Sequence, residues 1–199
     1  MALKEPHLNN HLCKGWKIPP HRTPAPEGLN LWNSFDYCGN FVYKNQHLDH
    51  IMMQEGILKR MPDGSFRPEY FIRDHLGSVR VCYTDNPATP TPDVLQVNNY
   101  YPFGMSMTPS EGENAYKYNG KELYEDQGLD WYDYGARFYD PQIGRWHTVD
   151  PLAHKFSHIS PYAFVENNPI NLIDPDGREP IKPLVGSVST FVALLNNSP

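Results

Sequence analysis

The feature that most constrains the fold of this chain is a recurring Tyr-x-Gly-x-x-x-Tyr unit. It occurs at residues 37–43 and 118–124, and a shortened form follows at residues 134–139. Each copy supplies a glycine that can take a positive φ angle, flanked by large rings that can pair across two strands. Because one such hairpin cannot bury its own face, the repeat predicts a stack of antiparallel β-hairpins.

The rest of the chain agrees with a mainly β fold. Short runs of aromatic and β-branched residues alternate with turn-forming residues, and the 14 Gly and 20 Pro among 199 residues stay below the low-complexity range of about 25–30%. The clearest hairpin joins residues 70–73 to residues 78–83 through a turn that ends at a glycine. Structural turn roles are predicted for Asp74, His75, Gly77, Gly120 and Asp140.

One short helix is predicted near the C-terminus. Ser160 is placed as its N-cap, Pro161 at its first position and residues 162–166 as its body, before Asn167-Asn168-Pro169 ends it. The two ends of the chain, by contrast, are expected to be ragged.

The core is expected in the second half of the chain. Nine of the thirteen tyrosines fall between Tyr100 and Tyr162. Residues 150–177 are expected to fold back on these aromatic strands, because they carry an apolar set made of Tyr162, Phe164, Ile170 and Leu172.

Charge and composition exclude several classes of partner. The net charge of -6 lacks the basic footprint of a nucleic-acid-binding protein. The longest apolar-biased stretch, residues 184–195, is shorter than the roughly 20 residues of a membrane span, and the first 28 residues lack the apolar region of a signal peptide. We therefore expect a chain that is cytoplasmic as synthesised, without a membrane span and without a nucleic-acid partner. No metal and no cofactor are expected either.

Three Asp-Pro dipeptides recur within a short distance, at Asp140, Asp150 and Asp174, and Arg137 and Arg145 accompany them. Asp-Pro is common turn chemistry, since Asp caps its own backbone and Pro fixes φ. A pair of carboxyls held close together can also share one proton and act as acid and base on a water. Spacing alone favours the turn interpretation.

Several motifs together resemble the RHS repeat-associated core domain of Rhs/YD-repeat polymorphic toxins and of the C components of Tc toxin complexes. The resemblance spans residues 29–177 and is densest from Tyr116 onward. The motifs are DHLGSVR at 74–80, YGARFYDP at 134–141, GRW at 144–146, DPL at 150–152, PYAFVENNP at 161–169 and DPDG at 174–177.

This resemblance implies hairpins of the YD/RHS-repeat type whose C-terminal end plugs a hollow shell, and an intramolecular aspartyl protease. The family's two aspartates and arginine fall on Asp150, Asp174 and Arg137 here, with the cleavage region at Gly177 and Arg178. The implied partners are the chain's own upstream YD-repeat shell and a C-terminal cargo, and the implied destination is export or delivery at a cell surface.

The resemblance divides the chain into a disordered tail at 1–28, the core domain at 29–177 and a remnant of the variable toxin region at 178–199. The chain departs from the family in two ways. It has Arg178 at the position where the family usually has a leucine just before the cleaved bond. It also has only about one upstream repeat, as expected of a truncated cassette. Two functions stay open: a delivery-protein core with an aspartyl autoprotease, and a noncatalytic structural module or orphan gene fragment whose Asp-Pro motifs only form turns.

Overall fold

The computed structural model describes residues 34–107, 112–125 and 128–183, so the predicted tail at 1–28 lies outside the described residues. The chain divides into two compact units. The first holds residues up to Tyr70 together with Tyr83–Asp93, and the second holds Phe71–Cys82 together with the residues from Val94 onward. Within the described ranges no helix is long and apolar enough to cross a membrane.

The fold is mainly β and antiparallel, as the repeat predicts. A seven-stranded sheet has the order β1-β2-β3-β4-β5-β6-β7, so every strand pairs with its neighbours in sequence. The sheet's strands are β1 (Phe35–Cys38), β2 (Phe41–Lys44), β3 (His47–Met53), β4 (Gly56–Arg60), β5 (Phe66–Arg73), β6 (Val79–Thr84) and β7 (Asp93–Val97).

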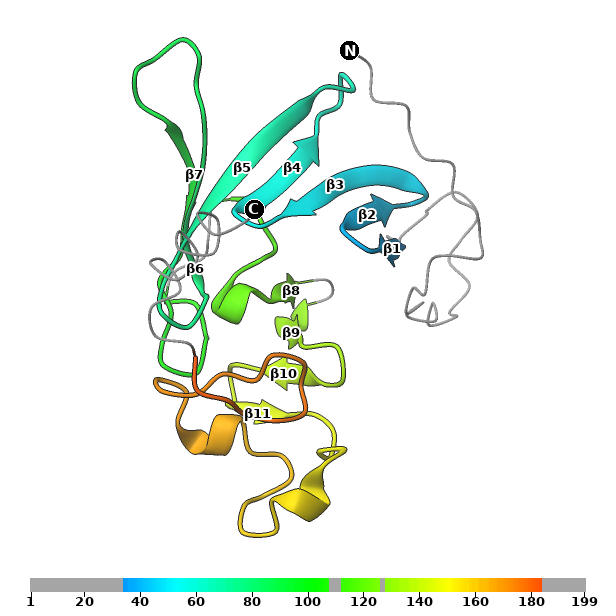
Figure 1. Ribbon diagram of the computed structural model, residues 1–199, viewed down its shortest axis with the longest axis vertical. Coiled ribbons are helices and arrows are strands. Elements are labelled where there is room, and N and C mark those ends of the chain that lie inside the picture. Colours follow the sequence, from blue (N-terminus) through cyan, green and yellow to red (C-terminus); the bar gives the residue numbers. More distant parts are fainter. Residues whose placement is uncertain (1–33, 108–111, 126–127, 184–199) are drawn as a thin grey trace, which may run out of the picture. The chain divides into compact units, whose positions relative to one another are not determined.

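In the first unit, β1 to β4 form successive hairpins (Figure 1). The first repeat forms the β1–β2 hairpin, whose turn glycine Gly39 has φ of 61°. Val42 of β2 and Ile57 of β4 are buried, with 1% and 4% of their surface exposed. The prediction that a glycine in a turn joins two strands with large rings is therefore confirmed for this hairpin.

In the second unit, the predicted connection between β5 and β6 is a tight turn over residues 74–77. The N–H of Gly77 donates to the carbonyl of Asp74 at 2.9 Å, and the Asp74 carboxylate accepts from the N–H groups of Leu76 and Ser78 at 3.0 Å each. Gly77 has φ of 81°. Local side-chain capping thus forms this turn.

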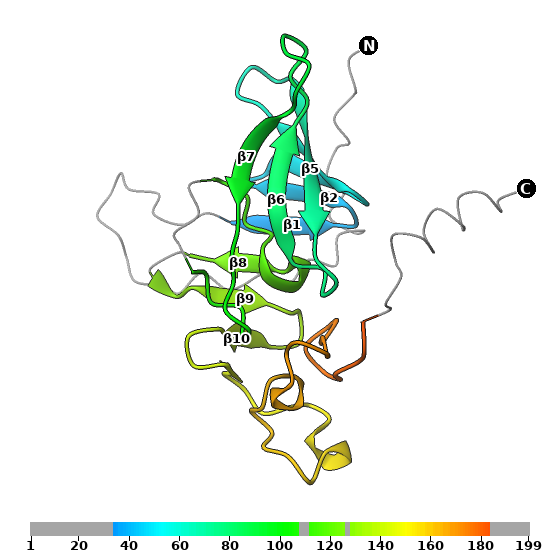
Figure 2. The same cartoon turned by 90° about the vertical axis from the view of Figure 1, so that its left-hand side faces the viewer.

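A second, four-stranded antiparallel sheet has the order β11-β10-β9-β8. Figure 2 shows β8, β9 and β10 as neighbouring strands in this order. Its strands are β8 (Glu122–Tyr124), β9 (Trp131–Asp133), β10 (Phe138–Asp140) and β11 (Arg145–Trp146).

The core of the second unit is a cluster of rings, where the tyrosine count predicts it. Phe164 is fully buried and stacks on Tyr139 with ring centroids 3.8 Å apart, and Trp146 packs edge-on against both Tyr134 and Phe164. The cluster consists of Tyr100, Tyr118, Tyr132, Tyr134, Tyr139, Trp146, Phe164 and Val165. Short strands therefore obtain their packing from ring contacts instead of long apolar runs.

The buried tyrosines keep their hydroxyl groups satisfied. Tyr139 donates to the carbonyl of Phe103 at 2.7 Å, and Tyr118 donates to that of Pro102 at 2.9 Å. Tyr134 donates to the side-chain oxygen of Asn119 at 2.8 Å. Burial raises the pKa of the Tyr134 hydroxyl well above its usual value, so the neutral donor form persists.

The predicted C-terminal helix is shorter than expected and of another kind. The carbonyl of Pro161 accepts from the N–H of Asp150, and the carbonyl of Tyr162 accepts from the N–H of Trp146, both at 3.1 Å. These two carbonyls are therefore not available for the hydrogen bonds of a helix. Helical turns in this region occur only as the 3-10 segments η3 (Ala153–Lys155) and η4 (Val165–Asn167). In η4, positive φ angles at three consecutive residues make a left-handed turn.

The apolar set predicted for residues 150–177 is only half correct. Phe164 enters the core and Leu172 packs against it, but Tyr162 and Ile170 remain 40% and 56% exposed. Both exposed residues lie in turns: Tyr162 precedes the isolated bridge between Ala163 and Arg145, and Ile170 follows η4.

Two glycines of the second unit should respond differently to a methyl group. Gly104 has φ of 89° and an added Cβ would lie 2.5 Å from the Tyr118 ring, whereas at Gly77 the nearest atom is 3.9 Å away. We expect Gly104→Ala to lower the free energy of unfolding by about 3 kcal/mol and Gly77→Ala by about 1 kcal/mol. Urea denaturation measures both, and equal losses would contradict the packing around Tyr118.

Candidate functional site

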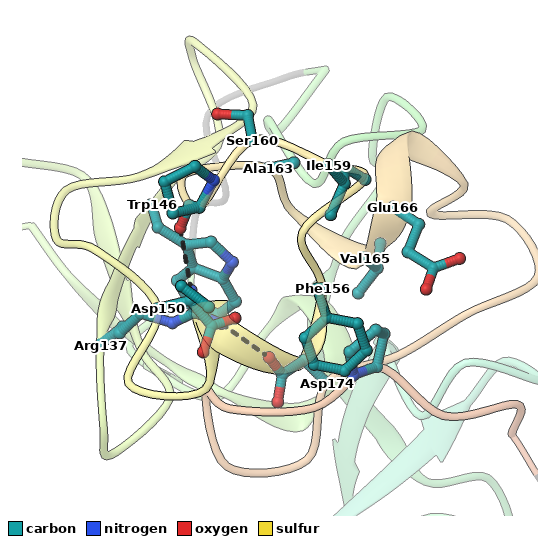
Figure 3. Close-up of a pocket in the computed structure, with 13 residues that line it drawn as sticks. Arg137, Trp146, Asp150, Phe156, Ile159, Ser160, Ala163, Val165, Glu166 and Asp174 are labelled. Atoms are coloured by element: carbon teal, nitrogen blue, oxygen red, sulfur yellow. Dashed lines mark hydrogen bonds and ion pairs between the residues drawn. The ribbon is translucent and has the colours of Figure 1, made fainter.

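Two of the three Asp-Pro carboxylates meet at one buried arginine. Nη2 of Arg137 lies 3.1 Å from Oδ2 of Asp150 and 3.4 Å from Oδ2 of Asp174 (Figure 3). The Arg137 and Asp174 side chains are each 2% exposed, and that of Asp150 is 11% exposed. The residues that the resemblance singles out are therefore neighbours in space.

Contact with the same nitrogen also limits how far apart the two carboxylates can lie. The Oδ2 atoms of Asp150 and Asp174 cannot be farther apart than the sum of the two contacts, 3.1 and 3.4 Å. That sum is below about 7 Å, the reach of a direct or single-water hydrogen-bonded pair. A water that bonds both carboxyls is geometrically allowed.

Arg137 is held in place by packing on several sides. It precedes β10 and its guanidinium lies over the Trp146 ring, 4.1 Å from the centroid. The N–H of its neighbour Ala136 donates to the carbonyl of Asp176 at 3.0 Å, which ties this loop to the final Asp-Pro turn. Burial lowers the Arg137 pKa while the two carboxylates oppose that shift, and a guanidinium stays charged throughout the working range.

Asp174 caps the turn that it begins. Its Oδ1 accepts from the backbone N–H groups of Gly177 at 2.7 Å, Arg178 at 3.0 Å and Asp176 at 3.2 Å. Burial nevertheless raises the pKa of this carboxyl above its ordinary value, against the effect of those donors and of Arg137. Burial thus biases Asp174 toward the protonated form.

Asp150 is positioned by local backbone contacts. Its Oδ1 accepts from the N–H of Leu152 at 2.6 Å, as in an Asx turn, and its own N–H donates to the carbonyl of Pro161. Its Oδ2 is left facing Arg137. One oxygen of each aspartate thus builds a turn, while the other faces the arginine.

The peptide bond between Gly177 and Arg178 lies directly against this group. Nε of Arg137 donates to the carbonyl oxygen of Gly177 at 2.6 Å, and the N–H of Arg178 donates to Asp174. A guanidinium on the carbonyl oxygen draws electrons from its carbon, and the carboxyl lies beside the nitrogen that would leave. Both ends of this one amide are held.

The chain beyond this amide is also held. Ile173 and Ile181 exchange two backbone hydrogen bonds of 2.9 and 2.7 Å, which close a loop around residues 174–180. Lys155 forms an exposed ion pair with Glu179 at 3.6 Å. The guanidinium of Arg178 lies 3.9 Å from the Asp176 carboxylate.

The remaining predicted residues lie elsewhere in the second unit. Asp140 accepts from the N–H of Gln142 at 2.8 Å and contacts His147, as a turn residue would. The His75 ring contacts the carbonyl of Ile170 at 3.2 Å. Gly120 has φ of 68° at the end of the 3-10 turn η1 (Tyr118–Gly120).

Lys121 is a contributor that the sequence interpretation missed. Its ammonium donates to the carbonyl of Pro175 at 2.5 Å and lies over the Tyr134 ring, 5.0 Å from the centroid. Burial lowers its pKa, although the nearby Asp174, Asp133 and Asp176 favour the charged form. Nothing in the local sequence around this lysine marks it as a neighbour of a turn 54 residues away.

Replacing this lysine should loosen the turn that carries the Gly177–Arg178 amide. We expect Lys121→Met to destabilise the turn by about 1 kcal/mol, since a charged hydrogen bond to Pro175 is lost. Hydrogen exchange at the Gly177 and Arg178 amides should then accelerate roughly fivefold. Lys155→Met, which removes only an exposed ion pair, is the control, and equal acceleration in both variants would contradict a specific role for Lys121.

A pocket opens beside the aspartates. Its apolar walls include Phe156, Ile159 and Val165, and Arg137, Trp146, Asp150 and Asp174 border it (Figure 3). Among the described residues no group of three or more His, Cys, Asp or Glu side chains is placed to hold a metal ion.

Comparison with known proteins points to toxin subunits. The chain is 42% identical over 94 residues to toxin subunit YenC2 and 40% identical over 96 residues to toxin subunit YenC1, both of Yersinia entomophaga, covering 44% and 45% of this chain. It is 36% identical over 109 residues, 53% of the chain, to salivary gland surface protein 1 of Aedes aegypti. These matches span 9% of each toxin subunit and 3% of the mosquito protein, and no protein-family model matches the chain.

Solved structures show the same fold. A crystal structure of TcdB2-TccC3-Cdc42 superposes with a TM-score of 0.57 at 23% identity, over 73% of this chain and 8% of that one. A Tc holotoxin pore of Photorhabdus luminescens with a mutation in TccC3 gives a TM-score of 0.57 at 24% identity, over 75% of this chain and 8% of that one. Similarity to Tc-type toxin subunits is therefore shown in sequence over less than half of the chain, and in fold over about three quarters of it.

Proposed function

We propose that residues 29–177 are the core module of a Tc- or Rhs-type toxin-delivery protein, and that Asp150, Asp174 and Arg137 form an intramolecular aspartyl protease. One observation carries this proposal. Arg137 contacts both carboxylates through Nη2 and the Gly177 carbonyl through Nε, so the acid–base pair and an amide of the same chain share one buried cation.

The geometry favours the Gly177–Arg178 bond as the one that is cut. Arg137 polarises the Gly177 carbonyl while a water held between the carboxyls adds to its carbon. Asp150 takes a proton from the water, and Asp174 gives its proton to the nitrogen of Arg178 as the C–N bond breaks. The products are a C-terminal carboxyl at Gly177 and a new N-terminus at Arg178.

Mass spectrometry of the purified full chain tests this function. We expect two fragments that meet at Gly177 and Arg178, or at the bond that follows Arg178, in place of the intact 22.9 kDa mass. Because related modules usually have leucine at this position, Arg178→Leu provides a second substrate, and it should cleave at least as fast as the wild type. If both chains stay intact at mildly acidic and neutral pH, the protease proposal is wrong.

The pH dependence follows from the acid role of Asp174. Its pKa is raised by burial, so the protonated form is complete at low pH and is lost as the pH rises through that raised value. The cleavage rate should therefore fall with rising pH, by tenfold per unit above the Asp174 pKa. Mass spectra taken at intervals over a range of pH values measure this fall in the cleavage rate of the wild type. Asp140→Asn is the matched control and should show the same pH dependence. A rate that keeps climbing above the Asp174 pKa would contradict Asp174 as the acid.

A second candidate function is a noncatalytic plug or interaction module. The three backbone N–H groups that converge on Oδ1 of Asp174 favour it, because they are what a turn-capping carboxylate needs. Under this alternative, both aspartates stabilise the fold and the chain never cleaves. The same mass spectra distinguish the two functions.

The proposed setting is a longer protein. An upstream shell of YD repeats would adjoin this module, and residues 178–199 would begin the segment that cleavage releases as cargo. Export or delivery at a cell surface follows from the same proposal. Sequencing the flanks of the gene tests this setting, since an upstream repeat array is expected.

A further inference from the structure

Lys121 brings a cation from a distant part of the chain to the turn that carries the acid of the proposed protease. Its ammonium donates to the carbonyl of Pro175, the residue bonded directly to Asp174, at 2.5 Å. It also lies over the Tyr134 ring, 5.0 Å from the centroid, and the hydroxyl of that ring donates to Asn119. The position of the ammonium beside this turn is therefore fixed from two sides.

Asp174 is the carboxylate that interacts most strongly with this ammonium. Burial lowers the pKa of Lys121, and three carboxylates oppose that shift, in order of decreasing effect those of Asp174, Asp133 and Asp176. The Asp174 side chain is 2% exposed, whereas that of Asp176 is 61% exposed, and charges interact more strongly where water is excluded. Because the attraction is mutual, the ammonium must favour the ionised form of Asp174 as well.

The other charges that face Asp174 leave a positive charge to be supplied. Nη2 of Arg137 is shared between Asp150 and Asp174, so ionisation of both carboxyls leaves one negative charge unbalanced in a buried site. The ammonium of Lys121 supplies the balancing charge from the neighbouring carbonyl. The charged groups around Asp174 are Arg137 ahead of β10, Asp150 after β11, Glu166 of η4 at the border of the pocket, Lys121 ahead of β8, and Asp176 and Arg178 of its own turn.

We propose that Lys121 is a positioning residue that controls how readily Asp174 gives up its proton. Its ammonium, fixed on the Pro175 carbonyl, favours transfer of that proton to the nitrogen of Arg178, and it sets the pH above which cleavage slows. This inference deepens the proposed function and rests on it for the effect on cleavage, whereas the coupling between the two side chains is measurable without any cleavage. Removal of the positive charge should make Asp174 keep its proton to higher pH.

Nuclear magnetic resonance of the full chain with ¹³C-labelled aspartate carboxyls tests this coupling. All variants carry Asp150→Asn, which keeps the chain intact, and the Asp174 signal is the one that disappears on Asp174→Asn. We expect Lys121→Met to move the titration of Asp174 to higher pH, so that its protonated fraction above the midpoint rises about threefold. Lys121→Arg, which keeps the charge, should restore the original titration. Lys155→Met, which removes an exposed cation paired with Glu179, is the matched control and should leave it unchanged.

The same coupling is measured from the other partner in a chain that keeps Lys121. Asp174→Asn, added to the Asp150→Asn chain, removes the carboxylate with the largest effect on the ammonium. Lys121 should then lose its proton at lower pH, as read from the ¹⁵N signal of its Nζ. Asp176→Asn, which removes an exposed carboxylate, should shift this titration less. This readout does not require the Lys121→Met variant to fold.

Equal Asp174 titrations in the Lys121→Met and Lys155→Met chains, or an unchanged Lys121 titration after Asp174→Asn, would overturn the proposal. Failure of the protease itself looks different, because the wild type and Arg178→Leu would then both stay intact while the two titrations still shift.

In a chain that cleaves, with Asp150 restored, the fall of the cleavage rate should move to higher pH in Lys121→Met and stay in place in Lys121→Arg. A fall at the same pH in both variants would remove Lys121 from the control of cleavage.

Discussion

Asp150→Asn and Asp174→Asn should each abolish cleavage of a chain that otherwise cuts itself. Asparagine keeps the shape and the turn-capping oxygen of each residue, but it cannot exchange the proton that the reaction requires. Loss of a general acid or base costs about 10²- to 10⁴-fold in rate. Intact-mass spectra taken at intervals after purification would therefore show only full-length chain in either variant.

Asp140→Asn is the matched control for this experiment. It alters the third Asp-Pro motif, whose carboxylate caps a local turn at Gln142. This variant should cleave at the wild-type rate. Normal cleavage in either Asp150→Asn or Asp174→Asn would remove that residue from the mechanism and favour the turn-capping alternative.

Phe164→Ala should unfold the second unit or come close to doing so. Phe164 is fully buried and contacts the rings of Tyr118, Tyr134, Tyr139 and Trp146. Removing such a ring typically costs about 3–5 kcal/mol, a large part of the 5–15 kcal/mol that stabilises a domain. Thermal unfolding followed by near-ultraviolet circular dichroism measures the loss.

Tyr162→Ala, two residues away, controls for the local backbone. Its ring is 40% exposed, so its removal should cost less than about 1 kcal/mol. Similar losses in the two variants would mean that the ring cluster does not dominate the stability of this unit.

Local chemistry was readable from the sequence by itself. A turn glycine with positive φ and an aspartate that caps its own turn both act over three or four residues. The hairpin around Gly77 could therefore be predicted from the sequence. The alternation of rings and turn residues likewise predicts the antiparallel strands. For the proposed catalytic pair, spacing favoured turns over a proton-sharing pair of carboxyls, and the family resemblance was needed to select Asp150 and Asp174.

Only the tertiary structure decided which of these features act together. The meeting of Arg137 with Asp150 and Asp174 depends on contacts across 13 and 37 positions of the chain, which no local pattern encodes. The same holds for Lys121, whose partner carbonyl lies 54 residues away. The predicted helix failed for a related reason, because long-range hydrogen bonds from Trp146 and Asp150 took the carbonyls that a short helix would have used. A segment of two turns has too little helical stability of its own to compete with such partners.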